Sequence, residues 1–214
     1  GSAPGTGTLA GCTGNIGIGK DVFAALTQGD YNVMIGYKAG DALTTGVDNI
    51  GIGQDAISAA TTGSNHIGIG KNALAAVVSG TGNVAIGVNS MAAHQSNDGY
   101  NVAIGQEALE ASTTASRCIA IGYQALEACN TNYNIGIGPA AGKAITSGTR
   151  NIGIGTGACD AYDAENDNIG IGYDALGGSI AGGEKNVAVG SYAGDALTSA
   201  DNCTLVGHNA GTSI

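Results

Sequence analysis

The sequence predicts an all-β protein, a parallel β-solenoid built from about twelve coils of 17 residues. Three observations predict this fold class. The string Asn-Ile-Gly-Ile-Gly at residues 15–19 returns in similar form along the whole chain. β-Branched residues alternate with small residues inside each copy, and Gly, Ser and Thr gather between copies. A near-constant repeat period is typical of proteins in which each unit packs on its two neighbours.

The last glycine of each copy sets the register of the array and is called the anchor glycine. The spacing between successive anchors is constant to within one position. They are Gly19, Gly36, Gly53, Gly70, Gly87, Gly105, Gly122, Gly138, Gly155, Gly172, Gly190 and Gly207. Residues 1–14 are interpreted as a tag remnant with an N-terminal partial repeat, and residues 15–214 as a single β-roll repeat array. Because the chain stops at a unit boundary, we expect it to be excised from a longer fibre.

Each copy is expected to contain one short strand. The residue before the anchor is Ile or Val in all twelve copies, and the residue three before is Ile or Val in all but Thr204. β-Branched residues at period two indicate a strand with one buried face. A run of about five residues is too short for a helix. We therefore expect the Ile and Val side chains to fill the interior of the solenoid.

The residue between these two is small and points to the opposite face of the strand. It is Gly or Ala in ten copies, and the exceptions are Met34 and Leu205. Since no Ser, Thr, Lys or Glu occurs there, we expect this face to be buried closely against a second chain. The predicted trimer-facing small positions are Gly17, Gly51, Gly68, Ala85, Ala103, Ala120, Gly136, Gly153, Gly170 and Ala188.

Four residues before the anchor, Asn occupies nine of the twelve copies. His66, Cys118 and Cys203 occupy the other three. Stacked amides at equivalent positions of a solenoid can form a hydrogen-bonded ladder along its axis, and His66 is interpreted as a further ladder member. The predicted Asn ladder comprises Asn15, Asn32, Asn49, Asn83, Asn101, Asn134, Asn151, Asn168 and Asn186.

A second short segment follows the anchor and is also expected to face inward. Ala lies three residues after the anchor in ten copies, and the next residue is mostly apolar or Gly. Several copies then close with Thr-Thr-Gly or Ser-Gly, which indicates turns. With a step of about 4.8 Å per coil, the array would form a rod about 55–60 Å long.

Composition excludes several function classes. Seven Lys and Arg against a net charge of −10 leave no basic surface for nucleic acid. No apolar run approaches the roughly 18 residues that cross a bilayer, so no membrane insertion by this segment is expected. The five cysteines are odd in number and form no Cys-x-x-Cys pair, which argues against a zinc site or a disulfide framework. They are interpreted as substituted core or ladder residues.

We predict no enzyme and no cofactor. Residues 14–20 fit the start of a phosphate-binding loop, but Asp21 stands where Ser or Thr should hold magnesium. The acidic residues Asp160, Asp163, Glu165 and Asp167 are weak calcium candidates, although a solvated turn is favoured. The three histidines lie in separate copies, so no catalytic set can be assembled.

The repeat resembles a known family. Residues 83–87 and 101–105 read Asn-Val-Ala-Ile-Gly, and residues 118–126 read Cys-Ile-Ala-Ile-Gly-Tyr-Gln-Ala-Leu. These strings resemble the YadA-like head repeats of trimeric autotransporter adhesins and the similar Asn-x-Ala-Ile-Gly repeats of phage tail fibres. The resemblance covers about residues 14–214. The repeat unit is longer than common autotransporter units, and no anchor, stalk or neck segment is recognised, which favours a phage fibre.

This resemblance implies a left-handed β-roll in an intertwined or side-by-side homotrimer. It also implies a structural role in an adhesive fibre, on a virion (tail fibre) or a bacterial cell surface, with a cell-surface glycan or protein as receptor. Candidate receptor contacts lie in the longer copies, at residues 94–100 and 177–185. The named candidates are His94, Gln95, Asn97, Asp98 and Tyr100.

Tyr31, Tyr100 and Tyr133 all lie five residues before an anchor and could stack as a stripe. Exposed Tyr with Asn and Asp suits glycan or protein surfaces, although ordinary surface turns are the favoured interpretation of these segments. Two alternatives remain open. A monomeric β-solenoid that binds ice or another ordered surface would need a row of outward Thr residues. A glycan-processing fibre domain would need paired carboxylates on adjacent coils, and we identify neither pattern in the sequence.

Overall fold

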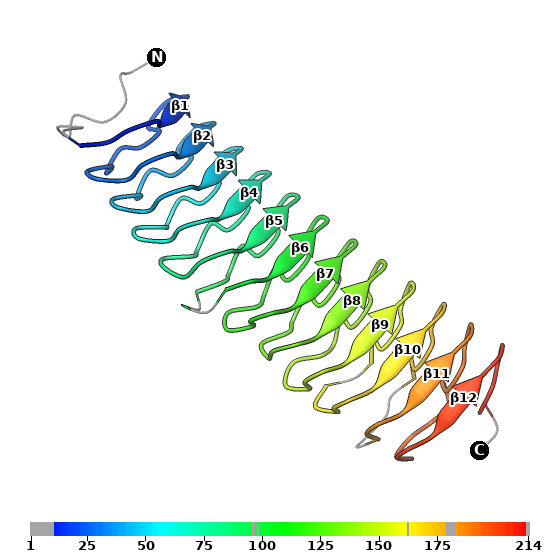
Figure 1. Ribbon diagram of the computed structural model, residues 1–214. Coiled ribbons are helices and arrows are strands. Elements are labelled where there is room, and N and C mark those ends of the chain that lie inside the picture. Colours follow the sequence, from blue (N-terminus) through cyan, green and yellow to red (C-terminus); the bar gives the residue numbers. More distant parts are fainter. Residues whose placement is uncertain (1–10, 96, 98, 162, 179–182, 213–214) are drawn as a thin grey trace.

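The computed structural model describes residues 11–95, 97, 99–161, 163–178 and 183–212. Twelve strands form one parallel sheet in sequence order, from β1 at one end of a rod to β12 at the other (Figure 1). The strands are β1 (Ile16–Ile18), β2 (Val33–Ile35), β3 (Ile50–Ile52), β4 (Ile67–Ile69), β5 (Val84–Ile86), β6 (Val102–Ile104), β7 (Ile119–Ile121), β8 (Ile135–Ile137), β9 (Ile152–Ile154), β10 (Ile169–Ile171), β11 (Val187–Val189) and β12 (Thr204–Val206). The described residues contain no helix. The predicted all-β fold, a parallel β-solenoid with one short strand per sequence repeat, is confirmed.

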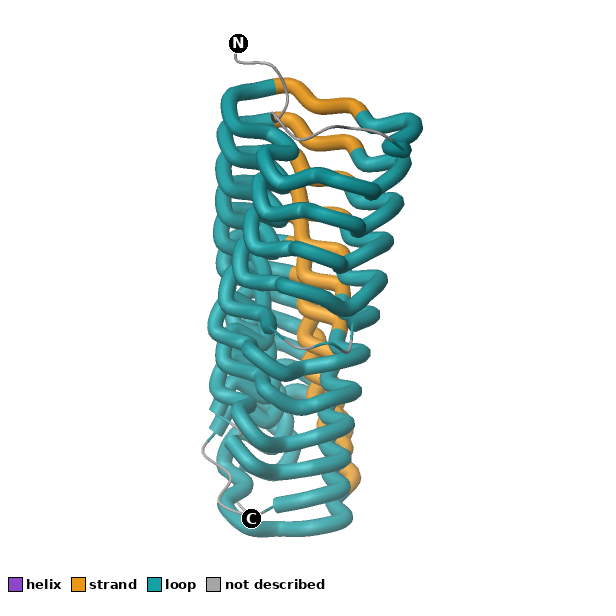
Figure 2. Tube along the Cα trace, turned by 90° about the vertical axis from the view of Figure 1, so that its left-hand side faces the viewer, coloured by secondary structure: helices purple, strands orange, loops and turns teal. Residues whose placement is uncertain are grey.

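Neighbouring strands pair between equivalent residues of successive copies. In β3 and β4, for example, Ile50 pairs with Ile67 and Gly51 with Gly68. Coils that are one residue longer or shorter than the others keep this register, because the length differences fall in the loops. Figure 2 shows the strands stacked along one side of the rod, with turns and loops forming the rest of each coil.

The turns rely on left-handed backbone conformations at fixed positions. Residues five before, two after and four after the anchor have positive φ in every copy, whether or not they are glycine. The conformation costs a non-glycine residue roughly 1–2 kcal/mol, and it is adopted even by β-branched Ile57 at φ +53°. Hydrogen bonds between coils offset this cost, such as the one from the Ile57 N–H to the Ala73 carbonyl (2.9 Å).

The anchor glycine is required by both conformation and space. Gly53 has φ +136°, and a Cβ built on it would lie 2.5 Å from the carbonyl oxygen of Gly70. A side chain at this position would therefore force two successive coils apart. The predicted tight turn at the anchor is confirmed, and its glycine allows coils of the same chain to stack.

The middle residue of each strand faces the interior of its own coil. Ala85 and Ala103 are fully buried within the single chain. A Cβ added at Gly68 would lie 2.7 Å from Cγ1 of Ile57, and one added at Gly136 would lie 2.9 Å from Cγ of Leu126. The prediction that the small positions face another chain is therefore wrong. They are small because large side chains from the second segment fill the narrow interior opposite them. The reassigned positions are Gly17, Gly51, Gly68, Ala85, Ala103, Ala120, Gly136, Gly153, Gly170 and Ala188.

The Ile and Val residues that flank the small residue point outward. Ile104 is 36% exposed, and Ile154, Ile171 and Val189 are similar. The prediction that these side chains fill the interior is therefore also wrong. The core is built instead from the second segment and the residues that follow it, including Leu43, Leu74 and Leu109. We call the two columns of outward residues, one and three before each anchor on β1–β12, the outer Ile/Val face.

Candidate functional site

The Asn ladder is present and closes each coil. The backbone N–H and Nδ2 of Asn49 both donate to Oδ1 of Asn32, at 3.0 Å each, and Nδ2 also donates to the carbonyl of Gly63 at 2.8 Å. Each ladder Asn except Asn83 bonds its own closing turn in this way, and its Oδ1 accepts a hydrogen bond from the next coil. The backbone N–H groups of Cys118 and Cys203 donate to the preceding ladder oxygen in the same way. The predicted ladder is confirmed, and its role is structural because these groups are buried and bonded to one another.

His66 is a member of this ladder, as predicted. Its backbone N–H donates to Oδ1 of Asn49 at 3.0 Å, and its Nδ1 accepts the backbone N–H of Asn83 at 3.2 Å. Burial, followed by the charge of nearby His94, lowers the pKa of His66 to about 4. Among the described residues, Nδ2 of Asn83 finds no hydrogen-bond acceptor. The imidazole therefore fits the ladder less well than an amide does.

The structure exposes some of the candidate receptor contacts and buries one of them. Gln95, Asn97 and Tyr100 are exposed, and Asn97 accepts a hydrogen bond from Oγ of Ser79. His94 is fully buried, so its assignment as a surface contact is wrong. It lies seven residues after its anchor, where other coils place core residues such as Leu43. Asp98 lies outside the described residues, as does the 179–182 part of the second candidate segment.

The four acidic residues do not converge on a cation site. The Glu165 carboxylate accepts the backbone N–H groups of Asp163 and Ala164, at 3.0 Å each, and Asp163 also bonds Thr146. Asp167 instead forms an ion pair with Arg150. Burial, followed by the charge of Asp174, raises the pKa of Asp160. The described part of the chain contains no group of three or more His, Cys, Asp or Glu arranged to hold a metal ion.

Cys129 and Cys159 occupy core positions and Cys118 a ladder position, as the repeat register predicts. Cys118, Cys129 and Cys159 are buried, and the five cysteines are free thiols. Burial raises the pKa of Cys159 to about 12. A hydrogen bond with Cys129, together with burial, raises the pKa of Cys118. A buried thiol with a raised pKa is a poor nucleophile, so Cys118 and Cys159 behave as small apolar residues.

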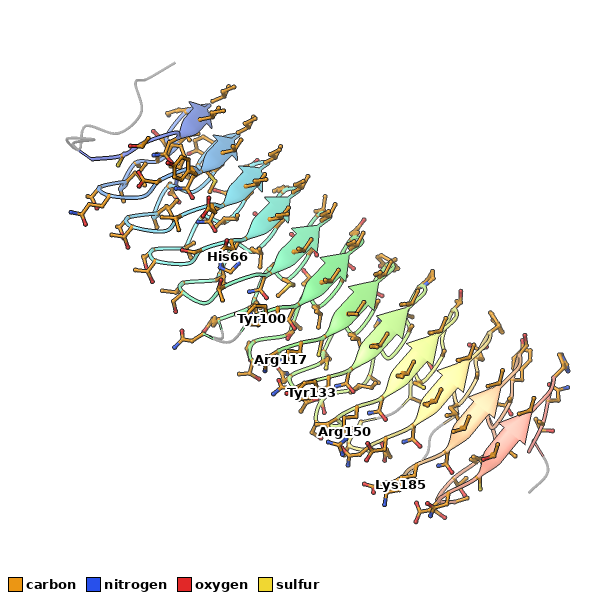
Figure 3. All side chains as sticks on the ribbon, viewed as in Figure 1. His66, Tyr100, Arg117, Tyr133, Arg150 and Lys185 are labelled. Atoms are coloured by element: carbon orange, nitrogen blue, oxygen red, sulfur yellow. The ribbon has the colours of Figure 1, made fainter. Side chains whose placement is uncertain are left out.

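The tyrosine stripe proves to be a mixed row of tyrosines and charged residues. Tyr31 is exposed but lies four coils away from Tyr100, so the three tyrosines do not form one continuous stripe. Between Tyr100 and Tyr133 lies Arg117, whose guanidinium carbon is 5.8 Å from the centre of each ring. Arg150, Asp167 and Lys185 continue the same column in the following coils. We call the set Tyr100, Arg117, Tyr133, Arg150, Asp167 and Lys185 the Tyr–Arg row. All of its members except Asp167 are labelled in Figure 3.

Sequence reasoning found the tyrosines of this row but missed its cations. The shared offset in the sequence would have identified them, because all six residues lie five positions before an anchor glycine. A smaller cluster lies near the N-terminal end of the rod, where Lys20 and Lys38 lie 5.9 and 5.6 Å from the centre of the Tyr37 ring. Tyr173 and Tyr192 form an edge-to-face pair with ring centres 5.2 Å apart.

Within the described residues, no helix has the length and apolar character needed to span a membrane. Comparison with protein-family models, curated proteins and solved structures gives no match. Three features of the chain bear on its function: the buried ladder, the outer Ile/Val face and the Tyr–Arg row. The ladder accounts for coil stacking, which leaves the two exposed surfaces as candidates for interaction.

Proposed function

We propose that the chain is a structural segment of a homotrimeric adhesive fibre, a phage tail fibre or a bacterial surface adhesin, that attaches to a cell surface. The observation that carries this proposal is the outer Ile/Val face. It extends over all twelve strands and contains no charged residue, and its single polar member is Thr204. Monomeric proteins rarely expose a continuous apolar patch of more than a few hundred Å².

The dimensions of this face suit contact with other copies of the chain. A rise of about 4.8 Å per coil and about 3.4 Å per residue gives a strip about 55 Å long and about 10 Å wide. Two such strips in contact would bury about 1,100 Å², close to the roughly 1,000 Å² expected of a specific interface. Two parallel columns also suit a threefold axis, because each column can pack on a different neighbour.

The number three and the adhesive role are supported by the resemblance of the Asn-x-Ala-Ile-Gly repeats to those of trimeric fibres. The surface that meets the partner chains differs from the sequence-based expectation. The Gly and Ala residues are used inside the coil, so the Ile and Val columns are the surface available to partners. A closed symmetric trimer would cover this face while leaving the loop edges, including the Tyr–Arg row, open to a receptor.

The test replaces two neighbouring residues of the face. Ile86 and Ile104 are paired on β5 and β6, and changing both to Glu places two charges where chains would meet. We expect the solution mass to fall from three times the chain mass of 20.7 kDa to that of one chain. The circular dichroism spectrum should stay unchanged, because both side chains point away from the core.

Val88→Glu is the matched control, because Val88 is 45% exposed but lies beyond the strand and outside the face. This variant should keep the mass of the parent. A parent protein that is already a monomer, or an Ile86→Glu and Ile104→Glu variant that keeps the parent's mass, would contradict the proposal. A monomeric parent would favour the alternative function, in which a regular exposed face binds ice or another ordered surface, and an ice-growth assay would then test that function.

A further inference from the structure

The Tyr–Arg row forms a straight column on one edge of the rod (Figure 3). Each of its six residues has left-handed backbone φ, between +58° and +66°, which places one side chain per coil at the same point of the turn. Tyr100, Arg117, Tyr133, Arg150 and Lys185 are exposed. Successive members are separated by one coil, about 4.8 Å. The row is therefore a preformed linear surface parallel to the rod axis.

The row concentrates positive charge on an acidic protein. The chain has a net charge of −10 and seven Lys and Arg, yet both of its arginines and one lysine lie in this column. Arg150 is neutralised by Asp167, with N–O distances of 2.6 and 2.9 Å. The ion pairs found among the described residues do not include Arg117, whose Nη1 donates to Oγ of Ser116 at 3.2 Å. Its guanidinium keeps further donors available to an anion.

Arg117 is also held in place before any ligand arrives. Its guanidinium carbon lies 5.8 Å from the ring centres of both Tyr100 and Tyr133, so it is flanked by aromatic rings on two sides. Cation–π contacts of this kind restrict the arginine while leaving its planar edge free for bidentate binding of a carboxylate or sulfate. A preorganised side chain loses less conformational entropy on binding.

The spacing of the cations selects the kind of polyanion. Arg117, Arg150 and Lys185 occupy alternate coils, so their spacing is about 9.6 Å. A single nucleic-acid strand carries one charge per about 3.4 Å, which this spacing does not match. An extended polysaccharide with one acidic sugar per disaccharide carries sparser charges. Its sugar rings can contact the exposed edges of Tyr100 and Tyr133 while its carboxylates reach the cations.

We propose that the Tyr–Arg row binds a linear acidic polysaccharide along the rod axis, with Arg117 and Arg150 holding its anionic groups and Tyr100 and Tyr133 contacting its sugar rings. This inference rests on the proposed attachment role, because it assigns the class of receptor to one surface of the fibre. Arg150 would exchange part of its pairing with Asp167 for the ligand. Binding of this kind weakens as ionic strength rises.

The test measures binding of hyaluronan oligosaccharides, which carry one carboxylate per disaccharide, to the intact chain by titration calorimetry at low salt. We expect measurable binding that weakens with added salt, and at least tenfold weaker binding by the Arg117→Gln and Arg150→Gln double variant. Tyr133→Ala should also weaken binding. The matched control is Lys20→Gln with Lys38→Gln, which removes the same charge beside Tyr37 at another surface and should change affinity less than twofold.

Several results would overturn the assignment. These are absence of hyaluronan binding, equal loss in the lysine control, equal binding of neutral chitin oligosaccharides, and tighter binding of a single-stranded oligonucleotide. Light scattering on the same samples separates this inference from the proposed function. A trimer that fails to bind refutes the polysaccharide site alone, whereas a monomer refutes the trimeric fibre whether or not it binds.

Discussion

Replacing His66 by Asn should stabilise the protein at acidic pH, because it returns the buried ladder to the residue used in nine other coils. The imidazole accepts the Asn83 backbone N–H through Nδ1, and protonation of that nitrogen would remove the acceptor. An amide at the same position supplies an oxygen acceptor that does not titrate. The amide oxygen can also accept a hydrogen bond from Nδ2 of Asn83, which has no hydrogen-bond acceptor among the described residues.

The size of the effect follows from the pKa of His66. Burial lowers it from 6.5 to about 4 in the folded chain. Between these values the unfolded chain binds a proton at His66 that the folded chain does not. The contribution of neutral His66 to the free energy of unfolding is therefore fully present above pH 6.5 and is lost as the pH drops towards 4. Each pKa unit corresponds to about 1.36 kcal/mol, which makes the loss about 3 kcal/mol.

The assay is denaturant unfolding at pH 7, 5.5 and 4, followed by circular dichroism. The parent should lose about 3 kcal/mol more between pH 7 and pH 4 than the His66→Asn variant does. His208→Asn, at an exposed position in the last coil, is the matched control and should keep the pH dependence of the parent. If the parent and the His66→Asn variant show the same pH dependence, the account of a buried, neutral His66 is wrong.

Three further substitutions test the coil. Gly53→Ala should lower the melting temperature more than Gly207→Ala does, because both glycines have positive φ but a Cβ at Gly207 meets nothing within 4 Å; equal shifts would contradict the steric argument. Asn151→Ala removes a donor to the Glu165 carbonyl (2.7 Å) and the acceptor of the Asn168 N–H (3.0 Å). Denaturant unfolding should show a loss of stability of about 1–3 kcal/mol per group left unpaired. This loss should exceed that of Asn15→Ala at the exposed end. Ala103→Glu should prevent folding, because it buries an unpaired charge; a soluble variant with the parent's circular dichroism spectrum would refute the inward placement of Ala103.

Most of the correct sequence-based predictions follow from the repeat period. Residues at one offset from the anchor share one environment in a solenoid, so nine asparagines at one offset were enough to predict the ladder. The same register predicted the short strands and the turn at each anchor glycine. His94 could have been assigned to the core in this way, because other coils hold core residues such as Leu43 and Ile145 at its offset.

The orientation of the strand could not be obtained from hydrophobicity alone. Ile and Val are more apolar than Gly and Ala, so hydrophobicity alone predicts that they lie inside. The interior is narrow, however, and Ile57, Leu74 and Leu126 already fill it from the opposite wall. Only small residues fit against them, and the larger Ile and Val side chains face outward. This competition for interior volume depends on the distance between two walls, which the sequence does not display.

The central claim is that the outer Ile/Val face is covered by other copies of the chain. Its most direct test is the solution mass of the unmodified protein, measured by light scattering over a wide concentration range. A trimeric fibre predicts a constant mass equal to three times the chain mass of 20.7 kDa. A mass of 20.7 kDa at every concentration would contradict the claim, because the face would then be open to solvent.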